Sequence, residues 1–425
     1  GGIDMSTASQ NLSIASGLTL GAGQQAWTVA AGRILTASGT FTRNAGSTLL
    51  IDKTVHTGTV TASTVSNVNN IAGPWAFVHS TGAAAAGSAN GFTYATKNGS
   101  NQLVPFQSAT SANWGWTSSN NDTFNYDVTG PGGGGNQLGI PRTANTARYV
   151  GGAVTQYWGS NNTTTITLNG MMNAGTGTLT FAQNGPSNPA NSFGRLVVGA
   201  TGELVLTAAS AGITVNMPLI DGAGAGSVTT SGPNTVTFGA ANTFTGTLNV
   251  NAGTTVADPG NAATDRAFSF VSGITVHSGG TLRSGSNGLF GWDGSQEKPI
   301  TVQRGGTLVA NGELLSDVGV GLVTLNGGTL ATLAANSTDW GSWRFDQATD
   351  RLLVTDNSTV SATHVKFGNA SAAIEVQSGR TLNFTGTVND TANGGVSYLR
   401  KTGGGTLVLA GANTHTGATS LEAGT

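Results

Sequence analysis

Short strand-length segments that end at glycine recur along this chain, and this recurrence constrains the fold more than any other feature. The tetrapeptide Gly-Gly-Thr-Leu occurs at 279–282, 305–308 and 327–330, so its starts are 26 and 22 residues apart. A second unit occurs twice: Ala241–Gly246 and Ala412–Gly417 agree in five of six positions. Because periods of about 20 to 50 residues are typical of stacked supersecondary units, the sequence predicts a solenoid of short strands.

The composition favours β-structure with many corners. Glycine provides 66 of 425 residues, and only 8 % of residues are charged, against about 25 % in an average soluble protein. A hydrophobic content of 37 % and a net charge of −2 argue against disorder. Apolar residues alternate with threonine or serine in short runs, so one face of each strand can be buried. We therefore expect an all-β chain.

The pattern divides the chain into three regions. Residues 1–70 are expected to form N-terminal solenoid turns, and residues 159–425 the main solenoid with a small interruption at 258–300. Residues 71–158 carry 12 of the 28 aromatic residues. We interpret this middle region as an aromatic-rich insertion or irregular lobe.

Several classes of function lack support in the sequence. A net charge near zero argues against a nucleic-acid partner, which would need a basic stripe. The chain has no cysteine, and its five histidines are scattered without metal-ligand spacing, so we expect no metal and no cofactor. No run of 18 apolar residues predicts a transmembrane helix. The chain begins with Gly1 and not methionine, so we expect a processed or truncated N-terminus.

Residues Lys401–Thr425 resemble the autotransporter-associated β-strand repeat, whose usual form is Lys-x-Gly-x-Gly-Thr-Leu-x-Leu-x-Gly-x-Asn-Thr-Tyr-x-Gly. Here His415 stands where the repeat has an aromatic residue, whereas Phe244 keeps one in the earlier copy. The resemblance implies a right-handed parallel β-helix that is exported and displayed on a bacterial surface, and it implies no catalytic residues. It also leads us to expect the membrane anchor outside this segment, if there is one.

We therefore expect a secreted, non-enzymatic surface protein: a stalk, an adhesin or a filament subunit. Its expected partners are further copies of itself, joined head-to-tail or side by side, and surface glycans. The alternative is a polysaccharide lyase or glycosidase on the same fold, which would need acidic residues that converge in one groove.

The candidate residues for that alternative lie in the most charged part of the chain. They are the acids Asp339, Asp346, Asp350 and Asp356, the bases Arg344 and Arg351, and the sugar-stacking candidates Trp340 and Trp343. A weaker cluster consists of Asp293, Glu297 and Lys298 near Trp292. The competing interpretation of both is a solvated loop with weak ion pairs.

Two further sets of residues are candidates for recognition or for structure. Aromatic side chains in the middle region could bind glycans or a partner chain, or could form a small core. They are Trp75, Trp114, Trp116, Tyr126 and Trp158. Asn242 and Asn413, at equivalent positions of the repeated unit, are expected to form an internal asparagine ladder or left-handed corners.

Overall fold

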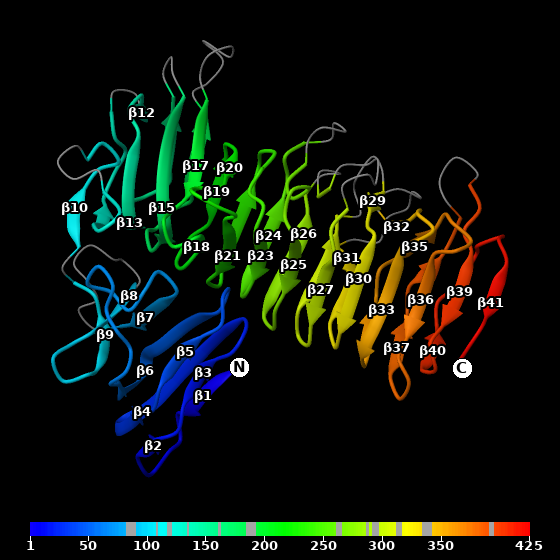
Figure 1. Ribbon diagram of the computed structural model, residues 1–425, viewed down its shortest axis with the longest axis horizontal. Helices are drawn as coiled ribbons and strands as arrows, with labels where there is room; N and C mark the ends of the chain where they lie inside the picture. Colours follow the sequence, from blue (N-terminus) through cyan, green and yellow to red (C-terminus); the bar gives the residue numbers. More distant parts are fainter. Residues whose placement is uncertain are drawn as a thin grey trace. The chain divides into compact units, whose positions relative to one another are not determined.

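The computed structural model describes most of the chain, and all of its regular elements are β-strands (Figure 1). The described residues are 1–81, 91–107, 109–116, 121–133, 136–159, 163–183, 193–260, 266–285, 289–290, 297–311, 317–333, 342–390 and 395–425. They divide into two compact units, Gly1–Val236 with Asn251–Gly253, and Thr237–Val250 with Thr254–Thr425. The described part contains no helix that is long and apolar enough to cross a membrane.

The second unit consists of stacked parallel strands in three rows. The first row is β23 (Thr247–Val250), β25 (Gly273–Val276), β27 (Ile300–Gln303), β30 (Leu322–Asn326), β33 (Arg351–Asp356), β36 (Ala373–Val376), β39 (Leu399–Thr402) and β41 (Thr419–Leu421). The second is β26 (Gly280–Ser284), β28 (Thr307–Ala310), β31 (Thr329–Thr332), β34 (Ser358–Val360), β37 (Thr381–Phe384) and β40 (Thr406–Leu409). A short third row is β29 (Val318–Gly319), β32 (Trp343–Phe345), β35 (His364–Phe367) and β38 (Thr387–Val388). Strands of one row are successive turns of a β-solenoid, which confirms the predicted fold class.

The Gly-Gly-Thr-Leu segments stack directly on one another. Leu282 pairs with Leu308, and Leu308 with Leu330, in parallel register, and all three side chains are 0 % exposed. The glycine that starts each segment has a positive φ, 84°, 77° and 82° in chain order, a conformation that glycine adopts at no steric cost. Glycine therefore turns the corner, and the leucine two residues after the glycine pair fills the core.

The first unit contains two rows of the same kind. One is β10 (Thr110–Ala112), β11 (Asn125–Val128), β13 (Arg142–Tyr149), β15 (Thr164–Asn173), β18 (Glu203–Thr207) and β21 (Ser227–Ser231), with β17 (Gly194–Val198) beside β15 and β20 (Leu219–Ile220) beside β17. The other is β12 (Gln137–Leu138), β14 (Val154–Trp158), β16 (Leu179–Gln183) and β19 (Ile213–Asn216). The strands β22 (Thr235–Phe238) and β24 (Gly253–Ala257) contain residues at which the two units divide.

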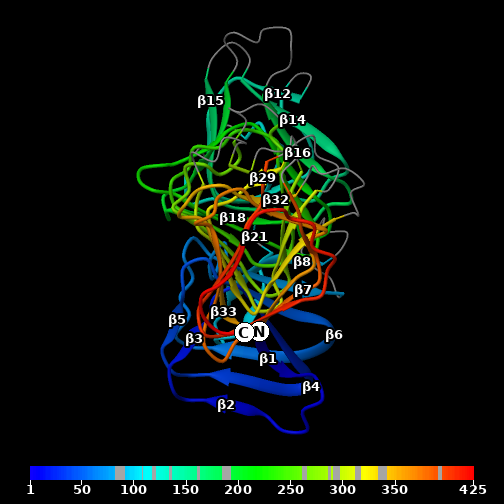
Figure 2. The same ribbon diagram turned by 90° about the vertical axis from the view of Figure 1, so that its right-hand side faces the viewer.

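A separate sheet at the N-terminus belongs to the first unit. Its parallel strands are β1 (Gly2–Met5), β2 (Leu12–Ile14), β4 (Gln24–Ala37), β6 (Thr48–Ala62) and β7 (Ala76–Ser80), and the antiparallel strands β8 (Phe92–Lys97) and β9 (Leu103–Pro105) follow. A two-stranded sheet, β3 (Leu18–Leu20) with β5 (Phe41–Arg43), lies on the same segment. In Figure 2, the strands β1, β2, β4 and β6 lie apart from β15, β18 and β21 of the same unit. We call this sheet, residues 1–81 and 91–107, the N-terminal sheet.

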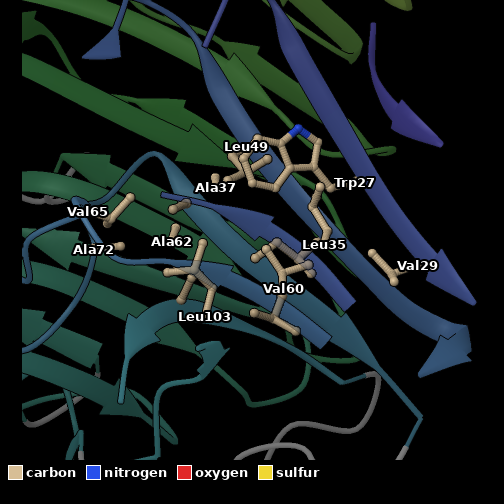
Figure 3. Close-up of a cluster of buried hydrophobic side chains, with 14 of the residues drawn as sticks. Trp27, Val29, Leu35, Ala37, Leu49, Val60, Ala62, Val65, Ala72 and Leu103 are labelled. Atoms are coloured by element: carbon tan, nitrogen blue, oxygen red, sulfur yellow. The ribbon is translucent and has the colours of Figure 1, made fainter. Parts of the chain in front are cut away.

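The N-terminal sheet has its own apolar core (Figure 3). Trp27, Leu35, Leu49 and Val60 are each at most 2 % exposed and belong to one cluster of buried side chains. These residues come from the long strands β4 and β6, where inward apolar residues alternate with outward polar ones. Alternation with a period of two buries one face of a strand. A second apolar cluster joins Phe77, Phe92 and Tyr94 of the sheet to Met172 of the solenoid rows.

The predicted region boundaries at 70/71 and 158/159 stay predictions. Strands pair in parallel across both of them, β6 with β7 and β14 with β16. Within 71–158, β8 and β9 form an antiparallel pair, whereas β10 to β14 belong to the parallel rows of the first unit.

Candidate functional site

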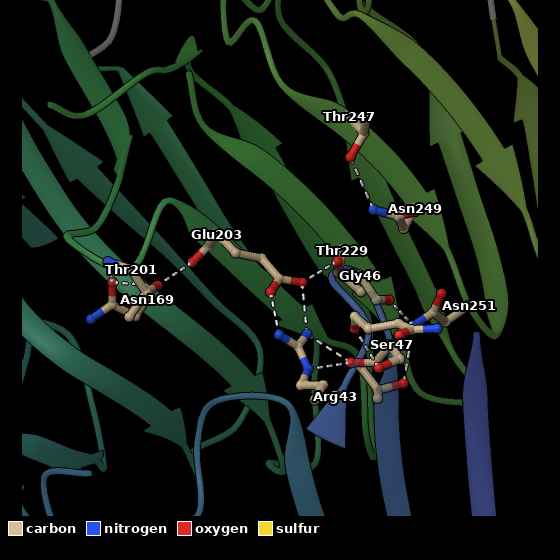
Figure 4. A network of polar contacts seen from close by, with 12 residues as sticks. Arg43, Gly46, Ser47, Asn169, Thr201, Glu203, Thr229, Thr247, Asn249 and Asn251 are labelled. Atoms are coloured by element: carbon tan, nitrogen blue, oxygen red, sulfur yellow. Dashed lines mark hydrogen bonds and ion pairs between the residues drawn. The ribbon is translucent and has the colours of Figure 1, made fainter. Parts of the chain in front are cut away.

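Polar side chains fasten the N-terminal sheet to the solenoid rows of the first unit (Figure 4). The Arg43 guanidinium donates to both carboxylate oxygens of Glu203, at 2.8 and 3.0 Å, and twice to the Ser47 carbonyl, at 2.9 and 2.7 Å. The Thr229 hydroxyl donates to the same carboxylate at 2.6 Å. The two charged side chains are only 18 % and 14 % exposed. A bidentate pair of this kind fixes both distance and orientation.

Neutral groups continue this contact. The Asn251 amide donates to the Gly46 carbonyl at 2.7 Å and to the Thr48 hydroxyl at 3.1 Å. The Thr48 and Ser231 hydroxyls are 3.2 Å apart, and Ser231 donates to Gln24 Oε1 at 2.6 Å. Side chains about 160 to 207 residues apart in sequence are thus joined by hydrogen bonds. We call these residues, with Arg43, Ser47, Glu203 and Thr229, the polar seam.

A ladder of asparagine side chains runs across three neighbouring turns of the first unit. The Asn145 amide donates to Asn125 Oδ1 at 2.9 Å, and the Asn169 amide donates to Asn145 Oδ1 at 3.0 Å. The Thr201 hydroxyl closes the row by donating to Asn169 Oδ1 at 2.9 Å. All three asparagines are buried, so each amide satisfies the next. Sequence reasoning missed this ladder, although asparagines 20 and 24 residues apart in neighbouring strands were a possible signal.

The predicted recognition aromatics lie mostly inside the first unit. Trp114, Trp116, Tyr126 and Trp158 are between 0 and 5 % exposed. Trp116 stacks on Tyr126 with ring centroids 4.4 Å apart, and Trp114 meets Trp158 edge-on at 6.3 Å. Of the two interpretations of these rings, a recognition surface or a small core, their burial favours the core.

The fifth candidate, Trp75, is half-buried near the polar seam. Its ring stacks on Phe41 with centroids 6.0 Å apart, and the Arg43 guanidinium lies 5.4 Å from the ring centroid. These contacts give Trp75 a packing role between strands.

Residues of the repeated unit hold corners to neighbouring turns. The Asn242 amide donates to the carbonyls of Ala240 and Ala267, at 3.1 and 3.0 Å. The Asn413 amide donates to the Gly411 carbonyl at 3.1 Å, and its oxygen accepts from the Val388 N–H at 2.8 Å. Neither asparagine has a positive φ, so they bridge turns through side chains and not through left-handed corners.

Lys401 also connects neighbouring segments of the chain in the final repeat. Its side chain points inward, is 3 % exposed and donates to the carbonyls of Thr402, Gly403 and Ala423, at 2.9, 2.7 and 2.9 Å. Burial lowers the pKa of this ammonium. The three carbonyls compensate its desolvation and close the corner of the turn.

Three of the acids proposed for catalysis, Asp346, Asp350 and Asp356, lie in the described part of the chain. Asp346 pairs with Arg344, and Asp356 pairs with Arg304 and Arg380. Asp350 instead accepts the Gln347 N–H at 2.7 Å, and its burial raises the pKa of its carboxyl.

Arg351 and Trp343, from the same predicted set, also have partners within the chain. Arg351 pairs with Glu375 at 2.9 Å, and Trp343 is 0 % exposed with its indole N–H on the Ala331 carbonyl at 2.8 Å. Four candidates lie outside the described residues: Asp293, Trp292, Asp339 and Trp340. The described residues contain no group of three His, Cys, Asp or Glu that could hold a metal ion.

The sequence did not predict a buried ion pair in the second unit. The Lys366 ammonium lies 3.1 Å from both carboxylate oxygens of Asp317, and the Ser342 N–H donates to the same carboxylate at 3.2 Å. The two charged side chains are 0 % and 2 % exposed. Burial raises the pKa of the Asp317 carboxyl, while the ammonium opposes that shift.

Comparison with known proteins gives a match to one family model. The passenger-associated-transport-repeat model matches residues 228–257 and 399–425, the two copies of the longer repeated unit. No curated protein and no solved structure matches the chain. The matched repeats on a β-solenoid fit an autotransporter-passenger β-helix repeat protein.

Proposed function

We propose that this chain is a stiff, surface-displayed stalk. The passenger repeat implies a secreted or surface-displayed protein. The observation that carries the proposal is the parallel register that runs from turn to turn in the second unit, such as Leu282, Leu308 and Leu330 in one buried row. Each inner strand has hydrogen-bonded neighbours on both sides, so bending a unit strains many bonds together.

We further infer that this role is structural and not enzymatic. The passenger-repeat family suggests such a role, and the carboxylates of Asp346 and Asp356 are each paired with arginine side chains. A glycoside hydrolase would instead hold two carboxyl groups about 5 to 10 Å apart across one sugar. The test is turnover of a polysaccharide panel by the wild type and by Asp346→Ala/Asp350→Ala. Turnover that the double variant abolishes would favour the enzyme.

A stalk must be displayed on the cell surface and must be stiff, and each property can be tested. Brief protease treatment of intact cells that produce the protein should release peptides of this sequence, with a periplasmic marker left intact. Electron microscopy of the purified chain should show straight, uniform segments. Peptides that appear only after the cells are lysed, or images of collapsed globules, would contradict the proposal.

Adhesion and self-assembly are finer forms of the same role. Head-to-tail or side-by-side assembly stays a prediction, because the low charge content of 8 % supplies little repulsion between copies. Sedimentation velocity over a hundredfold concentration range tests it: a single monomeric species throughout would count against assembly.

A further inference from the structure

Two adjoining hollows open on the surface of the first unit, beside the N-terminal sheet. The larger has a volume of about 630 Å³ and the smaller about 280 Å³, and Asn70 and Phe106 line both. The larger extends over Thr96 of β8 and Pro105 of β9, and the smaller over Thr110 of β10. Together they reach the size that small-ligand sites usually have. We call them the amide groove.

The lining of the amide groove is polar but uncharged. The lining combines asparagine, glutamine and threonine with phenylalanine, valine and proline, and none of the described residues that line it is aspartate, glutamate, lysine or arginine. A phosphate or carboxylate ligand would find no cation there, and a metal ion would find no carboxylate. Amide and hydroxyl groups beside an aromatic ring suit a ligand that carries many neutral hydroxyls.

Hydrogen bonds within the chain hold the side-chain amides of Asn67 and Asn69, whereas the side-chain amide of Asn70 has no such bond among the described residues. Asn67 exchanges hydrogen bonds with the backbone of Lys97, both at 2.8 Å, and the Asn69 amide donates to the Asp122 carbonyl at 3.1 Å. Asn70 uses its backbone carbonyl to accept from Thr96 at 2.8 Å. Its exposed side chain makes no hydrogen bond within the described part of the chain, although it lines both hollows.

Asn69 and Asn70 lie at the tip of a tight turn beside the groove. They are consecutive and have φ of 53° and 68°. Val68 and Ile71 exchange backbone hydrogen bonds on either side of them, at 2.7 and 3.2 Å, and asparagine is a favoured residue in such a two-residue turn. The turn fixes the backbone of Asn70, which lines both hollows.

An aromatic ring stands at the other end of the groove. Phe124 lines the smaller hollow, is half-buried and stacks on Tyr126 with ring centroids 6.1 Å apart. Because Tyr126 in turn stacks on the buried Trp116, the Phe124 ring is held firmly at the surface. A rigid ring offers a platform to the C–H face of a sugar.

We propose that the amide groove binds a neutral oligosaccharide, with Asn70 as its hydrogen-bonding residue and Phe124 as its stacking platform. This adds a binding activity to the stalk and does not depend on the stiffness of the solenoid. A peptide fits the groove less well, since the edge strands beside it, β9 and β10, have three residues each, and β9 includes Pro105, whose nitrogen carries no hydrogen.

The test uses the full chain and isothermal titration with defined oligosaccharides. The probes are six-sugar oligomers of β-1,4-glucose, β-1,4-N-acetylglucosamine and α-mannose, with oligogalacturonate as the anionic probe and a mixed peptide pool as the third class. We expect saturable binding of at least one neutral oligomer and none of oligogalacturonate or the peptides. Binding of the anionic oligomer or the peptides in place of every neutral one would overturn the proposal.

Two variants localise the binding without disturbing the fold. Asn70→Gly removes the amide and suits the positive φ, and Phe124→Leu keeps an apolar side chain but removes the ring. Each should weaken binding about tenfold, as loss of one hydrogen bond or stacking contact does. The controls are Asn383→Ala and Phe270→Leu, which change an exposed asparagine and a 53 %-exposed phenylalanine of the second unit.

The four variants should share the wild-type thermal midpoint within about two degrees, which shows that the fold is intact. Neutral-oligomer binding that both groove variants leave unchanged would show that the amide groove is not the site. Absence of binding by every neutral oligomer would equally overturn the proposal, while leaving the stalk role untouched.

Discussion

The two units hold the same stacked backbone together with different side chains. In the second unit, leucine and valine repeat at the same place in successive turns, as Leu282, Leu308 and Leu330 do. In the first unit, part of the interior is held by the ladder of buried amides Asn125–Asn145–Asn169 and by the cluster of rings around Trp114. Stacked strands therefore tolerate different buried side chains. What they require is that a buried apolar group packs on an apolar group of the next turn, and that a buried polar group finds a hydrogen-bond partner there.

The largest effect is expected at the buried ion pair of the second unit. Lys366→Met leaves the Asp317 carboxylate buried without its ammonium, which should cost about 3 to 5 kcal/mol in the free energy of unfolding. The double variant Lys366→Met/Asp317→Leu should recover most of that loss, because apolar groups of similar size replace both charges. Urea unfolding measures both, and a single variant as stable as the wild type would show that the pair is not buried.

The aliphatic row of the second unit should respond to truncation almost as strongly. Leu308→Ala removes a side chain that is 0 % exposed and leaves a cavity, at a cost of about 2 to 5 kcal/mol. Thr307→Ala is the matched control, since Thr307 precedes Leu308 in the same strand and is half-buried on the outer face, where we expect a change of about 0.5 kcal/mol at most. Equal losses in the two variants would break the assignment of inner and outer faces.

Acid should weaken the second unit through His277. Burial lowers the pKa of this imidazole from 6.5 to about 4 in the folded chain. The unfolded chain therefore binds a proton at a pH where the folded chain does not, so stability is present above pH 6.5 and is lost as the pH falls towards 4.

From that shift we expect a loss of about 2 kcal/mol at pH 5 relative to pH 8. His277→Gln, which imitates Gln303 at the same place in the next turn, should flatten this part of the pH profile. An equally steep loss in the variant would assign the acid sensitivity to other groups. The measurement is urea unfolding at half-unit intervals of pH.

The asparagine ladder gives the corresponding test in the first unit. Asn145→Ala removes the middle amide, so the Asn169 amide loses its acceptor and the row is broken, at an expected cost of about 1 to 3 kcal/mol. Asn383→Ala, at an exposed asparagine of the second unit, should change little. Hydrogen exchange of the β13 and β15 amides should rise only in the ladder variant; unchanged exchange would mean that the ladder adds nothing to the stacking.

The smallest effect is expected at the exposed ion pairs. Arg351 and Glu375 are 48 % and 31 % exposed, so Arg351→Ala should cost under about 1 kcal/mol, and less still in high salt. A loss comparable to that of Lys366→Met would remove the distinction between surface and buried pairs. Thermal unfolding at two salt concentrations measures it.

The fold could be predicted where the same residue type recurs at the same position of successive turns. Gly-Gly-Thr-Leu recurs because glycine is needed at the positive φ and leucine at the core position, and the structure confirms that these segments stack. The longer unit around Asn242 and Asn413 was visible for the same reason, and the family model matches both copies.

The rest depends on contacts that leave no local pattern. Arg43 and Glu203 are 160 residues apart, so no periodicity connects them, and the polar seam follows only from the folded chain. Trp114 and Trp116 were candidates for a recognition surface or for a small core, and only the folded chain shows that both rings are buried. Asn70 was not singled out, since its role depends on two hollows that form only after β8, β9 and β10 are in place.

Engineered disulfides test most directly that successive turns lie on one another in register. The chain has no cysteine, so a pair introduced into it has no competitor. Thr307 and Thr329 are register partners in β28 and β31, and paired strands are about 4.8 Å apart, which a disulfide can bridge. Thr307→Cys/Thr329→Cys should therefore close under mild oxidation, as mass spectrometry of its peptides will show, and Thr307→Cys/Ala331→Cys, two residues out of register, should not. Closure of the second pair in place of the first would contradict the stacked solenoid.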